Sequence, residues 1–182
     1  MLLNSVVIPS VREIKYLRRA CQADSPIVFI SDTNIGNLMS QVEFVHKHGK
    51  KVFADLELIG GFKPDSTGMK LLKNMYHLDG IFTTNVNAAR MANALGIIVV
   101  YRLFMIDSRS LKRSANILRN NHFDAIEVLP AECGVQEIEQ LTQMNDKHNY
   151  IAGGFVRDKE MIKEIFGVGI SAVTTSKVDL WE

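Results

Sequence analysis

Charged residues interrupt three segments of the sequence that otherwise have the apolar character of buried strands. Alternation along these segments puts Arg102, Glu127 and the pair Asp55 and Glu57 on faces that should point inward, and Arg12 lies just beyond another apolar segment. Burying an isolated ion is costly, so we expect Arg102 to meet a carboxylate. Two interpretations stay open: an ion cluster that satisfies itself, or a polar pocket for a small hydroxylated ligand. Paired carboxylates could also do acid–base chemistry, although no spacing here is specific to it.

A second group of residues has the character of an anion site. Gly153 and Gly154 close one apolar segment, and Thr175 and Ser176 close the last one. Glycine lets backbone N–H groups approach an anion closely, and the start of a helix adds positive potential. The alternative is a tight turn beside a solvated strand end.

A stripe of positive charge offers the best surface for nucleic acid. Arg109, Lys112, Arg113 and Arg119 recur at helical spacing on one side of a predicted helix. Residues 46–51 form a second basic group. The alternative for both is an ordinary solvated face.

The sequence predicts no metal site, no cofactor and no catalytic residue. Cys21 and Cys133 form neither a disulfide framework nor a zinc motif. His46 and His48 differ by two positions, so they do not share a helix face.

Short β-branched apolar segments alternate with longer amphipathic ones along the chain, and these are the elements that must position the polar residues. The predicted strands are Val6–Ser10, Ile27–Asp32, Lys51–Ile59, Gly80–Asn85, Ile97–Phe104, Ala125–Pro130, Tyr150–Phe155 and Ala172–Ser176. The predicted helices are near residues 11–22, 34–48, 66–77, 86–95, 108–120, 134–147 and 158–166. Gly49 and Gly96 follow two of these helices as C-cap glycines do, and Asp158 opens the seventh.

Eight strands that alternate with helices predict an α/β fold, a (β/α)8 TIM-type barrel, as a single domain over residues 1–182. The chain is shorter than the roughly 250 residues typical of this fold, and the shortage falls after Ser176, so the final helix should be vestigial. An open flavodoxin-like sheet is the rival, but it would leave three strands unexplained. In a barrel, the loops after strands seven and eight frequently bind phosphate, and these loops contain the glycine pair and the Thr-Ser pair.

Composition limits the location and partners of the protein. Hydrophobic residues make up 47% of the 182 residues and charged residues 23%, with a net charge of +1, so any site for nucleic acid must be local. The apolar N-terminal segment is too short for a signal peptide or a membrane span, which leads us to expect a cytoplasmic protein with no membrane partner. A homo-oligomer stays open, because a truncated last helix could leave an apolar gap near Trp181 that a second subunit would cover.

Read in order, the motifs resemble those of the bacterial glycerol-uptake operon antiterminator regulatory proteins, which respond to glycerol 3-phosphate. The resemblance rests on residues 8–12 (IPSVR), 50–53 (KKVF), 58–62 (LIGGF), 80–84 (GIFTT), 102–108 (RLFMIDS), 126–130 (IEVLP), 152–156 (AGGFV), 172–176 (AVTTS) and 180–181 (LW). The ordered set covers essentially the whole chain.

The resemblance implies a barrel that binds glycerol 3-phosphate as its effector and acts on the leader mRNA of glycerol-utilisation genes, favouring read-through of a terminator. Gly153, Gly154, Thr175 and Ser176 would then hold the phosphate. Arg12, Arg102 and Glu127 are the inward polar candidates, and Glu57 joins them as a pocket carboxylate.

Three positions depart from the family pattern. Glu57 stands where Asp is favoured, Asn85 where a basic residue is common, and Ala131 where glycine often follows the Leu-Pro pair. These departures bear on ligand identity more than on the fold.

Two rival functions remain at this point. One is a metabolic barrel enzyme that acts on a small phosphorylated substrate, and the other is a metabolite sensor that works through a protein partner. If the chain is a regulator, it needs an element with two states, and Gly60–Gly68 is the best candidate for a lid over the ligand.

Overall fold

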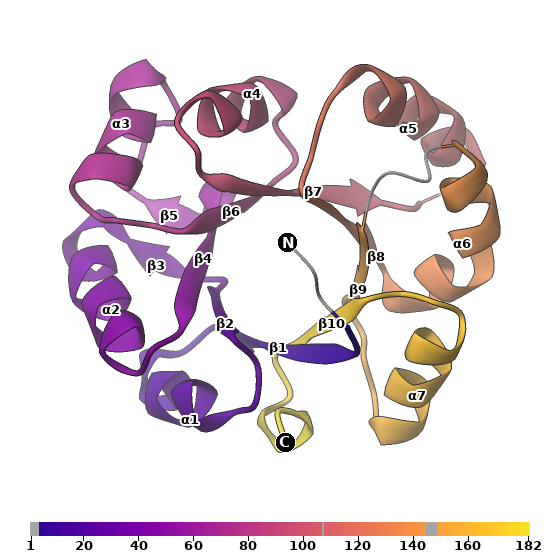
Figure 1. Cartoon of the computed structure of the whole chain (residues 1–182), viewed down its shortest axis with the longest axis horizontal. Coiled ribbons are helices and arrows are strands. Elements are labelled where there is room, and N and C mark those ends of the chain that lie inside the picture. Colours follow the sequence, from indigo (N-terminus) through magenta and orange to yellow (C-terminus); the bar gives the residue numbers. More distant parts are fainter. Residues whose placement is uncertain (1–3, 107, 145–148) are drawn as a thin grey trace.

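Eight parallel strands close into a barrel (Figure 1). Buried apolar side chains fill its interior. The structure is a computed structural model that describes residues 4–106, 108–144 and 149–182, with residues 108–113 described by their backbone alone. Around the barrel the strands follow the order β1-β10-β9-β8-β7-β6-β4-β2. Their bounds are β1 Val6–Val11, β2 Ile27–Ile30, β4 Lys51–Asp55, β6 Gly80–Thr83, β7 Ile98–Phe104, β8 Ala125–Leu129, β9 Asn149–Gly153 and β10 Ala172–Thr175. The predicted TIM-type fold is confirmed.

Seven α-helices in the described part of the chain ring the barrel (Figure 1). They are α1 Leu17–Gln22, α2 Ile35–Lys47, α3 Ser66–Asn74, α4 Val86–Ala94, α5 Ser108–Asn120, α6 Ala131–Met144 and α7 Lys159–Gly167. The predicted boundary signals are present: the Asp158 side chain accepts a hydrogen bond from the N–H of Met161, and Gly49 and Gly96 have positive φ angles.

Alternation of side chains along the strands divides the core into two layers. The inner layer fills the barrel and includes Phe29, Phe53 and Phe82, with the Phe29 and Phe82 rings stacked at 4.0 Å between centroids. The outer layer packs the strands against the helices. Because aromatic rings fill the interior, the barrel is a packed core that leaves room for a ligand only at its mouth.

A single 3-10 turn, Val178–Leu180, follows β10 where an eighth helix would stand. The C-terminus occupies the space between α7 and α1 (Figure 1). The vestigial final helix is therefore confirmed. Trp181 is only 3% exposed, so the chain covers this place by itself and the apolar gap expected there is absent from the described structure.

The segment after the third barrel strand differs from the prediction. The strand ends at Asp55, and a 3-10 turn, Leu56–Leu58, follows it, because the Asp55 side chain accepts the N–H of Glu57 and so favours a turn over a continued strand. Ile59–Gly60 (β5) then pairs with Thr33–Asn34 (β3) in a small second sheet. Glu57 therefore does not share a strand face with Asp55, and that prediction was wrong.

The expected lid is also shorter than predicted. Gly60 pairs with Asn34 in the small sheet, and α3 begins at Ser66 with Asp65 as its N-cap. Only residues 61–65 therefore remain as a loop. Residues 60–68 do not line the mouth of the barrel in the described structure. A lid at this place has no support from the geometry.

Candidate functional site

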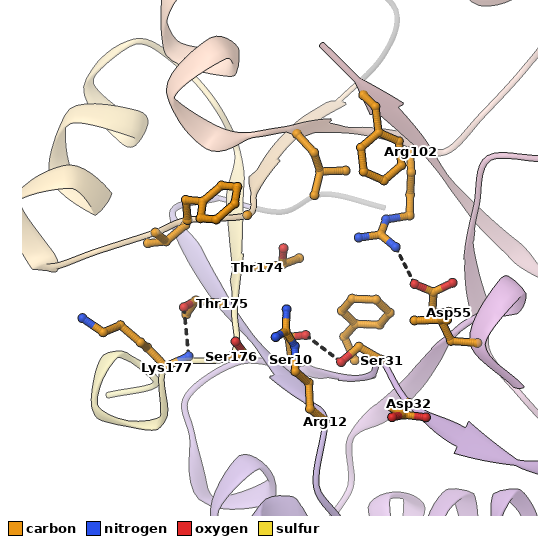
Figure 2. Close-up of a pocket in the computed structure, with 17 residues that line it drawn as sticks. Ser10, Arg12, Ser31, Asp32, Asp55, Arg102, Thr174, Thr175, Ser176 and Lys177 are labelled. Carbon is orange, nitrogen blue, oxygen red and sulfur yellow. Dashed lines mark hydrogen bonds and ion pairs between the residues drawn. The ribbon is translucent and has the colours of Figure 1, made fainter. Parts of the chain in front are cut away.

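A pocket of about 540 Å³ opens at the carboxyl ends of the barrel strands (Figure 2). Figure 2 shows two polar groups on opposite sides of it, Asp55 with Arg102 on one side and Thr175, Ser176 and Lys177 on the other. The pocket is lined by Ser10, Arg12, Phe29, Ser31, Asp32, Asp55, Leu58, Arg102, Phe104, Leu129, Gly154, Phe155, Val156, Thr174, Thr175, Ser176 and Lys177. Its position is the usual one for a ligand site in this fold.

A buried ionic network forms one side of the pocket. Arg102 and Glu127 are register partners on β7 and β8, and the Arg102 Nε donates to Glu127 Oε2 at 2.7 Å. The Arg102 Nη1 donates to Asp55 Oδ2. The second oxygen of Glu127, Oε1, accepts the Thr174 hydroxyl at 2.5 Å. Both Glu127 oxygens are thus occupied, and the sequence-based expectation that Arg102 meets a carboxylate is confirmed.

Asp55 differs from Glu127 in its access to the pocket. Glu127 is fully buried and does not line the pocket, whereas Asp55 lines it with 2% of its side chain exposed. Burial raises the pKa of Asp55 to about 6, although the Arg102 guanidinium acts in the opposite direction. Glu57 and Glu127 add to the upward shift. Asp55 is therefore a carboxyl group whose charge changes close to neutral pH.

The opposite side of the pocket offers groups suited to an anion. Gly154, with a φ of 77°, and the segment Thr175–Ser176 line this side, and Lys177 lies next to them. A left-handed backbone and the absence of a Cβ at Gly154 leave the main chain open to a close approach. Figure 2 shows the side chain of Arg12 reaching from the end of β1 into the pocket between the two polar groups. A guanidinium is well matched to a phosphate group.

Gly153 has a different position from Gly154, although the sequence placed both at the anion site. Gly153 is the last residue of β9, is buried, and does not line the pocket. A Cβ at this position would lie 2.5 Å from Glu127 Oε1 and 2.4 Å from the Thr174 hydroxyl. The geometry gives Gly153 a packing role: it makes room for the buried carboxylate.

Glu57 also lies away from the pocket lining. Its Oε1 accepts the Thr83 hydroxyl at 2.5 Å and the Thr84 N–H at 3.3 Å, which ties the turn after β4 to the end of β6. Asp55, two residues earlier, is the carboxylate that faces the pocket. The prediction that Glu57 lines the pocket was therefore wrong, and the pocket carboxylate is Asp55.

Several residues that line the pocket were not predicted as site residues. Ser10 and Ser31 hydrogen-bond to each other at 3.1 Å across the ends of β1 and β2, and Asp32 lies beside them. Thr174 and Lys177 flank the predicted Thr-Ser pair. Only their position in the sequence could have identified them as site residues, since each stands at or just after the carboxyl end of a barrel strand.

The predicted nucleic-acid stripe is described in part. The backbone of α5 is described from Ser108, and Arg119 is exposed in its last turn. The side chains of Arg109, Lys112 and Arg113 lie outside the described residues. In the second basic group, Lys47 and Lys51 are exposed, whereas the Lys50 ammonium donates to the carbonyl oxygens of Ala23 and Ser25.

Exposed apolar side chains surround the mouth. Phe155 is 84% exposed and Ile106 is 86% exposed, and Phe104 and Leu58 are about half exposed. Phe155 also has a φ of 56°, an uncommon conformation for a bulky residue. An exposed ring on a strained backbone is a feature that folding alone does not favour, so it points to a role in binding.

No group of three or more metal-ligating side chains is found within the described residues. No helix in the described part of the chain is long and apolar enough to cross a membrane.

The family model described as glycerol-3-phosphate responsive antiterminator matches residues 7–181. The chain belongs to this family. A glycerol uptake operon antiterminator regulatory protein from Listeria monocytogenes (strain 4b F2365) has a solved structure that is similar with a TM-score of 0.90 and 29% identity, covering 98% of this chain and 95% of that one. A glycerol uptake operon antiterminator-related protein from Thermotoga maritima MSB8 has a solved structure that is similar with a TM-score of 0.87 and 25% identity, covering 100% of this chain and 99% of that one.

Two further proteins are similar to this chain. The uncharacterized protein YgcP of Escherichia coli (strain K12) is 26% identical over 181 residues, which cover 100% of this chain and 94% of that protein. A deoxyribose phosphate aldolase from Aeropyrum pernix is only 12% identical, with a TM-score of 0.73 over 96% of this chain and 87% of that one. This last likeness shows the barrel fold alone.

Two of the three departures from the antiterminator pattern have a structural role here. The Asn85 side chain caps α4 by accepting the N–H groups of Asn87 and Ala88. Ala131 begins α6 and is fully buried. An early start of α6 at Ala131, three residues before the predicted position, is consistent with the better helix propensity of alanine over glycine.

Proposed function

We propose that this antiterminator-family chain binds glycerol 3-phosphate in the barrel mouth and, once loaded, binds the leader mRNA of glycerol-utilisation genes to promote antitermination. The observation that carries the proposal is that one pocket combines a side whose groups suit an anion with a carboxylate that accepts hydrogen bonds. Glycerol 3-phosphate has the matching chemistry, because it carries a phosphate at one end and hydroxyl groups at the other.

In this proposal the phosphate lies against the backbone at Gly154 and Thr175–Ser176, with Arg12 as the cation that reaches it. The hydroxyl groups lie toward Asp55 and Arg102. Glu127 and Gly153 support the site from beneath by holding Arg102 in place.

The same end of the barrel has features that suit single-stranded RNA. α5 begins at Ser108, shortly after the carboxyl end of β7, so its basic first turns belong to this end of the molecule. Phe104 and Phe155 are exposed at the mouth. Bases stack on exposed aromatic rings while cations neutralise the phosphates, which is how proteins hold unpaired RNA. Lys51, by contrast, opens β4 at the amino end of the barrel.

Strand β7 offers a physical route between effector and RNA. Arg102 and Phe104 line the pocket on this strand, and α5 follows within four residues of Phe104. A ligand that holds Arg102 in one position would favour one placement of α5, and regulation requires such a preference between two states. The proposed regulator uses no cofactor and works in the cytoplasm, where leader mRNA is made.

Calorimetry with and without leader RNA tests this function. Glycerol 3-phosphate should bind the wild type, and RNA should tighten that binding by the same factor by which the metabolite tightens RNA binding, typically about 5- to 150-fold. Binding of the metabolite with an affinity that RNA does not change would contradict the switch. Capture of a protein partner in place of RNA would favour the rival sensor.

One observation favours a second candidate, an enzyme that acts on a small phosphorylated substrate. Asp55 is a pocket carboxyl whose pKa lies at about 6, and perturbed carboxyl groups in clefts are typical of general acid–base catalysts. Prolonged incubation with glycerol 3-phosphate, followed by quantification of the remaining metabolite, separates the two candidates. The regulator returns its effector unchanged.

A further inference from the structure

The two sides of the pocket differ in the charge that they accept. On the Asp55 side, one guanidinium serves two carboxylates, so the Arg102–Asp55–Glu127 network carries one negative charge when both acids are ionised. On the other side, the backbone at Gly154 and the side chain of Arg12 favour an anion, whereas the Lys177 ammonium donates to the carbonyl oxygen of Arg157. A ligand that spans the pocket therefore needs two different ends.

Asp55 is the member of the network that retains capacity for a ligand. An ionised carboxylate offers about four acceptor positions. Glu127 is out of reach beneath the pocket, with both oxygens bound to Arg102 and Thr174. Asp55 accepts one bond from Arg102 on Oδ2 and one from the Glu57 N–H at 3.2 Å on Oδ1, and it lines the cavity. Asp55 therefore keeps acceptor positions that a ligand in the cavity could use.

The surroundings of Asp55 make a second anion costly at this side. Asp55 and Glu127 together carry more negative charge than Arg102 can neutralise, and these three side chains are largely removed from water. A hydroxyl group donates to the carboxylate and satisfies it. A carboxylate on the ligand would meet a like charge and would leave Asp55 without its donor.

We propose that Asp55 is the specificity-determining residue of the pocket, which accepts hydrogen bonds from the hydroxyl groups of a phosphorylated polyol and excludes a phosphorylated carboxylic acid of the same length. This inference rests on the proposed function, since it names the chemical class that the same site selects. Arg102 acts as the positioning residue that holds Asp55 against the cavity wall.

A matched pair of ligands tests the inference. Glycerol 3-phosphate and 3-phosphoglycerate share the phosphate and the three-carbon chain. At the other end, glycerol 3-phosphate has a hydroxymethyl group and 3-phosphoglycerate has a carboxylate. By calorimetry the wild type should prefer glycerol 3-phosphate by about 100-fold or more. In Asp55→Asn the preference should fall at least tenfold, because the amide has no charge to repel a carboxylate and can donate to it.

Glu57→Gln is the control, since it removes a carboxylate two residues away that does not line the pocket. It should keep the wild-type preference. Circular dichroism establishes that each variant is folded, and Asp55→Ser, which also removes the charge and keeps a small polar side chain, serves if the asparagine variant does not fold.

The outcomes separate the two proposals. A wild type that binds both ligands equally, or an Asp55 variant that keeps the full preference, would overturn the inference and leave the proposed function standing. A folded wild type that binds neither ligand would overturn the proposed function, and the inference with it.

Discussion

Gly153 lies against the buried carboxylate of Glu127, so closely that a Cβ on residue 153 would come within 2.5 Å of Oε1. This close approach explains why a glycine ends β9 at a position that does not line the pocket. The glycine determines where Glu127 can lie, and Glu127 in turn holds Arg102.

The packing of Gly153 on Glu127 leads to the first prediction. Gly153→Ala should lower the free energy of unfolding by about 1–3 kcal/mol, because the added methyl group must displace Glu127 or the Thr174 hydroxyl. Urea unfolding followed by circular dichroism measures the decrease. Gly167→Ala is the control, since a Cβ there meets nothing within 4 Å and the change should be neutral or stabilising. Equal stabilities of the two variants would contradict the packing role.

The second prediction concerns the anion side. Gly154→Asp should abolish binding of glycerol 3-phosphate while the barrel stays folded, because a carboxylate would occupy the proposed phosphate position. Gly154→Asn is nearly isosteric, has no charge, and tolerates the left-handed backbone as well as aspartate does. Calorimetry should show that the asparagine variant binds more tightly than the aspartate variant. If the two bind alike, the effect is steric and the phosphate lies elsewhere.

The third prediction is a pH dependence of stability that comes from Asp55. Its pKa of about 6 in the folded protein lies above the ordinary value of 3.8, so the folded state binds a proton more tightly than the unfolded state. The stability that this proton provides is present in full below about pH 4 and is lost as the pH rises through about 6. Relative to Asp55→Asn, the wild type should lose up to about 1.4 kcal/mol of unfolding free energy per pH unit in this window. Denaturant titrations at several pH values measure the difference, and parallel curves would contradict the raised pKa.

The fourth prediction concerns the basic helix. Replacing Arg109, Lys112 and Arg113 by alanine should weaken leader-RNA binding across sequences and flatten its salt dependence by up to about 3 units, roughly one for each RNA phosphate that is no longer neutralised. Binding measured from low to high salt gives the slope. Lys47→Ala with Lys51→Ala removes exposed charge from the amino end of the barrel and should change the slope little. The reverse result would move the RNA surface to that end.

The fifth prediction concerns the exposed ring of Phe155. Phe155→Ala should weaken RNA binding by about 5- to 150-fold, the range typical of one stacked base. Phe155→Tyr keeps an aromatic face and should restore most of the affinity. Fluorescence anisotropy with labelled leader RNA measures both variants. Equal affinities of the alanine variant and the wild type would remove the stacking role.

The sequence allowed the barrel and the inward direction of Arg102 and Glu127 to be predicted, because alternation in strands depends on local periodicity alone. Glu57 was misplaced because the Asp55 side chain captures the Glu57 N–H and ends the strand, a competition that periodicity does not reveal. Ser10, Ser31 and Asp32 were missed, since single small polar residues become a site only when parallel pairing brings the carboxyl ends of β1 and β2 together. The packing role of Gly153 needed the three-dimensional position of Glu127, 26 residues earlier in the chain.

The turn that replaces the eighth helix gives the protein an optical probe of its own pocket. Trp181 is the single tryptophan of the chain, and its indole N–H donates to the carbonyl oxygen of Thr175 at 2.8 Å. Thr175 lines the anion side of the pocket. A ligand that pulls on this segment changes the polarity around the indole, so the emission spectrum of the unlabelled protein should report occupancy in real time. Stopped-flow fluorescence would then yield the rates at which the effector arrives and leaves, without any dye or tag.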